Sequence, residues 1–66
     1  KGLMLLYLRV GKESFRREHL RSVAFMAVDA FQKRFDTSRC TVLIVHGDDT
    51  LAEGEYRNGE VTAKVR

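Results

Sequence analysis

The residues of this 66-residue chain that could do chemistry are one histidine with two aspartates close to it, and one cysteine. His46 is followed directly by Gly47, Asp48 and Asp49. An imidazole beside carboxylates is a set of ligands that divalent cations accept. The thiol of Cys40, six residues earlier, would become a nucleophile if a general base lay next to it.

The Gly-Asp-Asp sequence follows one apolar segment and precedes another with strand character. In this arrangement it resembles the metal-binding hairpin of polymerase palm domains. The resemblance implies a second carboxylate at the end of a neighbouring strand, because two cations share such a site. Residues 9–12, Arg-Val-Gly-Lys, supply none. We therefore expect 46–49 to form a solvated turn without a catalytic metal; loose binding of an ion by His46 with Asp48 or Asp49 is the alternative.

The remaining chemical groups predict no enzyme. Cys40 opens an apolar segment and is expected to be a small buried hydrophobe, while His19 is expected at the edge of a helix on the surface. The chain has no phosphate-binding loop and no Gly-x-Gly-x-x-Gly sequence, so we expect no cofactor. A single cysteine excludes an internal disulfide and favours a reducing, cytoplasmic location.

Two segments in the first half predict a strand and a helix. Residues 3–10 are apolar at nearly every position, which is typical of a strand that is covered on both faces. Residues 13–35 are predicted to form one long helix, with Ser14 as its N-cap. The apolar residues of the helix recur at intervals of three and four, so they form a stripe along one side. The members of this stripe are Leu20, Val23, Ala24, Ala27, Val28, Phe31 and Phe35.

The second half predicts a loop, a strand and a hairpin. Asp36-Thr37-Ser38 should form a loop, and residues 40–46 are rich in β-branched side chains that favour a strand. Asn58-Gly59 is a strong signal for a two-residue hairpin turn, because both residues tolerate positive φ. With this turn, Tyr56 faces Val61 and Gly54 faces Ala63, so the apolar residues share one face. Arg57 then opposes Glu60, and Glu53 opposes Lys64, on the other face.

The predicted fold is an α+β domain of β-α-β-β-β order that spans residues 1–66. One long helix packs on one face of a small mixed four-stranded sheet. The strands at 3–10 and 40–46 should be parallel and adjacent, since a helix connects them. The remaining strands should follow as an antiparallel meander. Because both ends of the sequence look cut, we expect a domain excised from a longer protein.

One helix covers only one face of such a sheet, yet the strands at 3–10 and 40–46 carry large apolar residues on both faces. Exposed apolar patches usually mark interaction sites. The sequence therefore predicts a module for protein–protein interaction or homo-oligomerisation. Its partner would be a second copy, another protein, or the rest of the parent chain. The expected interface, or its alternates on the opposite face, comprises Leu3, Leu5, Tyr7, Val42 and Ile44, together with Phe25 and Met26 of the helix.

The charge leaves a second function open. The chain has 12 Lys and Arg against 9 Asp and Glu, a net charge of +3, which allows weak attraction to anions. The alternative prediction is therefore a weak nucleic-acid-binding module that uses Arg16, Arg17 and Arg21. The run of apolar residues at 3–8 is too short to cross a membrane, so a membrane is expected as a partner only if a span precedes Lys1.

Overall fold

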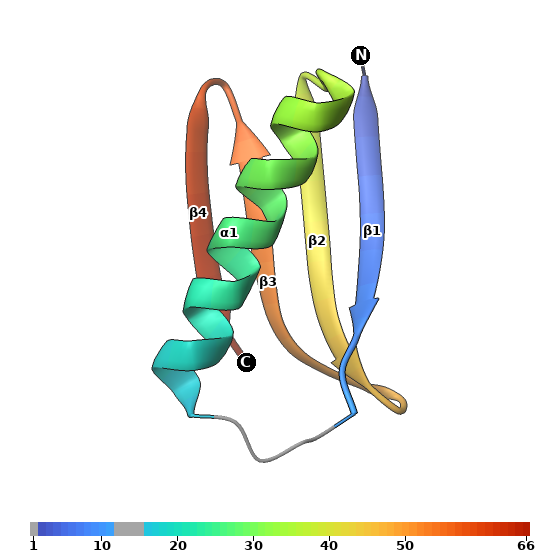
Figure 1. Cartoon of the computed structure of the whole chain (residues 1–66), viewed down its shortest axis with the longest axis vertical. Helices are drawn as coiled ribbons and strands as arrows, with labels where there is room; N and C mark the ends of the chain where they lie inside the picture. The colour runs from blue at the N-terminus through green and yellow to red at the C-terminus, as the bar shows by residue number, and fades with distance from the viewer. Residues whose placement is uncertain (1, 12–15) are drawn as a thin grey trace.

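A computed structural model describes residues 2–11 and 16–66 of the chain. One helix lies across a twisted sheet, and the chain order is strand, helix and then three strands (Figure 1). This confirms the β-α-β-β-β order and the α+β class that the sequence predicts. The elements are β1 (Leu3–Arg9), α1 (Arg17–Phe35), β2 (Arg39–His46), β3 (Asp49–Arg57) and β4 (Glu60–Val65).

The sheet has the order β1-β2-β3-β4, so each strand lies beside its neighbour in the sequence. β1 is parallel to β2, and the two later pairs are antiparallel. The predicted position of the first strand at the edge, next to the second, is confirmed. The position follows from the chain itself, because the strand after the helix returns beside the first strand and the two hairpins then extend the sheet in one direction.

The hairpin of β3 and β4 has the predicted register. Tyr56 faces Val61, Gly54 faces Ala63, and Arg57 faces Glu60 beside the turn. Asn58 and Gly59 both have positive φ, at 52° and 82°. A turn of this kind twists with the strands, so the local sequence determines which residues point toward the core.

The helix begins later than the sequence predicts. Arg16 has an extended backbone, with φ of −69° and ψ of 147°, and α1 starts at Arg17. The predicted N-cap, Ser14, and the predicted first residue, Glu13, lie outside the described residues. At its other end the helix stops as expected, because Asp36 adopts the left-handed conformation that commonly ends helices.

The core lies between α1 and the inner sheet face. Leu20, Ala24 and Val28 of the helix are buried, as the predicted stripe requires. Ala27 and Phe31 pack at its margin, whereas Val23 and Phe35 are exposed. The sheet contributes a second buried set, which consists of Cys40, Val42, Ile44 and Ala52.

The helix touches the sheet most closely at Gly54 in β3. A Cβ atom added there would collide with the carbonyl oxygen of Ala24 and lie 3.1 Å from Cγ1 of Val28. Both obstacles belong to the buried side of the helix, and one of them is backbone. Gly54 therefore sets the distance between the two layers.

We predict that Gly54→Ala lowers the free energy of unfolding by about 1–3 kcal/mol, because the added methyl group must push the helix away. Urea denaturation followed by circular dichroism measures the loss. The matched control is Gly11→Ala, where an added Cβ meets no atom within 4 Å. An unchanged unfolding midpoint for Gly54→Ala would contradict the close approach of helix and sheet.

Candidate interaction surface

The side chains of β1 alternate between the two faces of the sheet. Leu6 lies beside Val42, which is fully buried under the helix, so the even-numbered residues point to the helix side. The odd-numbered residues point to the other face, which we call the open face. There Leu3, Leu5 and Tyr7 are 69%, 52% and 62% exposed. Three large apolar side chains in a row are therefore in contact with solvent.

On the helix side, β1 is also poorly covered. α1 packs against β2, β3 and β4, and Figure 1 shows β1 to one side of the helix. Met4, Leu6 and Leu8 contact the edge of the core but remain only half-buried. The first strand is therefore apolar on both faces, as predicted, and it is partly exposed on both.

The structure separates the predicted interface residues into three groups. Leu3, Leu5 and Tyr7 share the open face as expected. Grouping Val42 and Ile44 with them was wrong, because both lie fully buried beneath the helix. The residue of β2 that does share the open face is Leu43, a half-buried neighbour of Tyr7. We call Leu3, Leu5, Tyr7 and Leu43 the β1 surface.

The third group lies on another layer. Phe25 and Met26 are 45% and 67% exposed on α1, where they line a shallow depression with Arg21 and Ser22. The sheet separates α1 from the open face. Phe25 and Met26 therefore cannot contribute to the same continuous patch as Leu5 and Tyr7.

Beyond β2, the open face is charged. The register places Glu55 two strands from Leu5, and Glu53 two strands from Tyr7. Glu55 lies 3.8 Å from Nη2 of Arg39, and Glu53 lies 2.9 Å from Nη2 of Arg66. Exposed ion pairs contribute little stability, but their charges are costly to remove from water. Along the rows of Leu5 and Tyr7, the apolar residues of the open face therefore belong to the β1 surface.

The backbone of β1 forms an edge of the sheet that is not paired with another described strand. The carbonyl of Gly2 accepts from the amide of Arg39, and the amide of Val10 donates to the carbonyl of Val45. Both are even-numbered, so by alternation the peptide groups of Leu3, Leu5, Tyr7 and Arg9 point away from β2. Among the described residues, β1 pairs with no strand other than β2. The sequence predicted β1 at the edge of the sheet, but alternation of side chains does not show which peptide groups point outward.

The His46 turn joins two strands instead of forming an open site. Nδ1 of His46 lies 3.1 Å from the carbonyl oxygen of Val10, so a protonated Nδ1 donates to the end of β1. Gly47 has φ of 60° in the tight turn, and Asp48 and Asp49 are exposed. Within residues 2–11 and 16–66 there is no group of three or more side chains suited to bind a metal.

Cys40 is fully buried in the inner face of the sheet, and its thiol is free. Desolvation by burial raises the pKa of this thiol above its ordinary value. A thiol that is both covered and protonated is a poor nucleophile. The structure thus places Cys40 as a core residue, as the sequence predicts.

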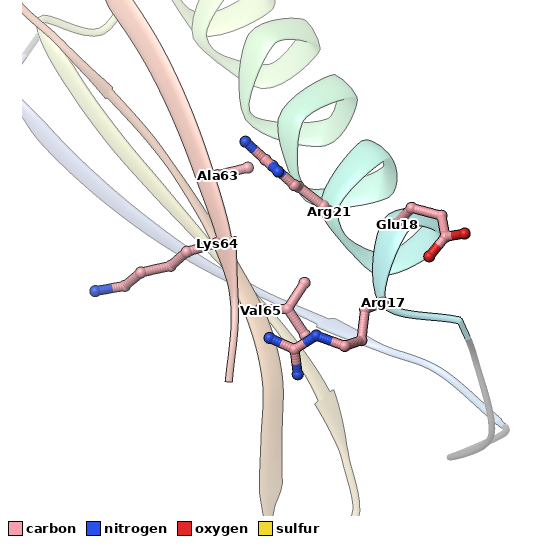
Figure 2. Close-up of a pocket in the computed structure, with 6 residues that line it drawn as sticks. All are labelled: Arg17, Glu18, Arg21, Ala63, Lys64 and Val65. Atoms are coloured by element: carbon pink, nitrogen blue, oxygen red, sulfur yellow. The ribbon is translucent and has the colours of Figure 1, made fainter.

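Two of the three predicted basic residues share one cleft. Arg17 and Arg21 line a cleft between the first turns of α1 and β4, together with Glu18, Ala63 and Val65. Figure 2 shows both guanidinium groups on the helix side of β4, whereas Lys64 extends to the opposite side of the sheet. Arg16 is exposed just before the helix. The cleft therefore joins two arginines to one acidic residue, Glu18.

No protein-family model matches the chain, and no curated protein or solved structure shows significant similarity to it. No helix among the described residues is both long enough and apolar enough to cross a membrane. The function is therefore inferred from the surfaces of the molecule itself.

We predict that Cys40 reacts with Ellman's reagent at least about tenfold more slowly in the native protein than in guanidinium chloride, because the thiol is reached only when the structure opens. The absorbance of the released thiolate measures the rate. An exposed thiol in Thr62→Cys, on the open face of β4, is the control and should react rapidly in both solvents. Equal rates for Cys40 in the two solvents would contradict its burial.

Proposed function

We propose that this chain is a non-enzymatic module for protein–protein interaction, which binds its partner through the β1 surface and the adjoining edge of the sheet. The observation that carries the proposal is the coincidence of two features on one strand. Leu3, Leu5 and Tyr7 expose apolar side chains, and the same residues direct their peptide groups away from β2. A strand with both features is suited to accept an extended segment of another chain.

Each feature supplies what the other lacks. Burying a large apolar side chain stabilises a complex by roughly 1.5–3 kcal/mol when it is fully transferred from water, and about half of that remains to be gained here. Main-chain hydrogen bonds contribute less net energy but fix direction and register. A partner strand at the edge would satisfy the peptide groups and would place its own side chains beside the β1 surface.

The edge carries little that would prevent such pairing. Natural sheets protect an exposed edge with lysine, proline or inward-pointing charges. The chain has no proline, and the one charged residue of β1 is Arg9, at the end of the strand. A sequence of six uncharged residues along a free edge is difficult to explain for an isolated domain, but is expected for a binding strand.

The compartment and the absence of catalysis are part of the same proposal. We place the protein in the cytoplasm, because its single cysteine is a free thiol in the core. We assign no reaction to it, since the histidine, the cysteine and the aspartates that could do chemistry belong to the core or to the connection between β2 and β3. His46 contacts the end of β1, Cys40 fills the core, Asp48 lies in the turn and Asp49 begins β3.

We predict that random linear peptides displayed on phage yield binders of alternating apolar character, which shift the amide resonances of β1 and of Leu43. Leu5→Lys and Tyr7→Lys should each weaken this binding at least tenfold, because a charge replaces a contact residue. Both substitutions should change the free energy of unfolding by less than about 1 kcal/mol, since these side chains are exposed. Titration by NMR and urea denaturation measure the two effects.

Thr62→Lys is the matched control, because it adds the same charge to the same sheet face on the distant strand β4. Its binding should equal that of the unmodified protein. Binders that shift resonances elsewhere and tolerate Leu5→Lys would place the interaction site on another surface and refute the proposal.

A further inference from the structure

We infer that the partner is a second copy of this chain, and that two β1 strands pair antiparallel about a two-fold axis to form one continuous eight-stranded sheet. The inference rests on the proposed function and specifies its partner. Three observations carry it. The outward peptide groups all belong to odd-numbered residues, the sequence of β1 is complementary to itself, and a stable dimer requires more area than the exposed side chains supply.

The parity of the edge determines the possible registers. In an antiparallel pair, two opposed residues exchange both hydrogen bonds when the peptide groups of each point at the other. Along β1 those residues are the odd-numbered ones, from Leu3 to Arg9. The register that overlaps the whole strand centres on Leu6. It opposes Leu3 to the partner's Arg9 and Leu5 to the partner's Tyr7, so every outward peptide group is matched.

The same register is favourable for the side chains. On the open face, Leu5 lies beside an aromatic ring, and aromatic and aliphatic cross-strand pairs stabilise sheets. On the helix side, Leu6 opposes its own copy and Met4 opposes the partner's Leu8, so half-buried apolar residues cover one another. Arg9 opposes a leucine and not a second arginine. No pair of like charges is therefore brought together along the strand.

The required area excludes binding through the side chains alone. A stable interface covers about 800 Å² of each partner. This is a large share of the surface of this chain, which is 4800 Å². Three partly exposed side chains supply only a few hundred Å². Pairing along the whole of β1 adds the peptide edge and the half-buried residues of the helix side, which together increase the covered area.

The helices leave room for this arrangement. The two-fold axis is perpendicular to the sheet, so both helices lie on the same side. Figure 1 shows α1 over the middle of the sheet, near β3. Five strand spacings then separate the two helices, about 24 Å, while a helix with its side chains is about 10 Å wide. The helices therefore do not collide, and Met4, Leu6 and Leu8 of both copies form the floor between them.

Sedimentation equilibrium of the 66-residue chain, from micromolar to millimolar concentration, tests the stoichiometry. We expect the mass to rise from 7.6 kDa toward twice that value. The association should not weaken at high salt, because both copies carry a charge of +3 and salt screens their repulsion. Leu5→Lys should shift the midpoint to at least tenfold higher concentration, and Thr62→Lys should not.

Cysteine cross-linking tests the register. Positions 5 and 7 of opposite copies should have Cα atoms about 5.5 Å apart, within reach of a disulfide. Each position should be more than about 7 Å from its own copy. Under mild oxidation, Leu5→Cys alone and Tyr7→Cys alone should remain monomeric on non-reducing gels, and their equimolar mixture should cross-link. The unmodified chain is the control for Cys40, which is fully buried.

The outcomes separate this inference from the proposed function. A dimer that does not form the cross-link between positions 5 and 7 overturns the pairing of the two β1 strands. The proposed function as an interaction module would still stand. A monomer at all concentrations that still binds the displayed peptides at β1 overturns the second copy, and makes another protein the partner. A monomer that binds no peptide at β1 overturns both.

Discussion

The width of a single helix is the constraint on which this structure depends. Adjacent strands are about 4.8 Å apart, so four strands present a wider surface than one helix of about 10 Å can shield. α1 lies over β2, β3 and β4, and its close contact with β3 is possible because residue 54 is a glycine. β1 is consequently the strand without a cover. The layer arrangement explains why β1 is exposed, but it does not explain why the exposed strand is apolar.

The sequence predicted those features of the fold that are set by neighbouring residues. Asn58-Gly59 fixes the turn, and alternation then fixes every pair of the final hairpin. The buried side of the helix followed from spacing at Leu20, Ala24 and Val28. The predicted start of the helix at residue 13 was wrong, because an acidic and a polar residue at 13 and 14 are compatible with both a first helical turn and a loop. Arg16, directly before the helix, has an extended backbone.

The candidate site was predicted less completely, because it depends on relations between distant segments. Leu3, Leu5 and Tyr7 were correctly placed together by their alternation within one strand. Val42 and Ile44 were assigned to the wrong side, since alternation in two strands leaves open which set of one faces which set of the other. The parallel register, in which Leu6 pairs with Val42, settles that choice through contacts more than thirty residues apart. The free peptide edge has no signature in side-chain patterns at all.

The position of β1 also has a consequence for how the chain acquires its structure. β1 is synthesised before the helix, yet its neighbour in the sheet, β2, is the third element in the chain. Translation adds about 5–20 residues per second, so this apolar strand waits on the order of seconds for its pairing strand. The hairpins that follow need contacts only between adjacent segments and close quickly. Until β2 has been synthesised, β1 is an unpaired apolar segment, which makes the nascent chain prone to aggregation.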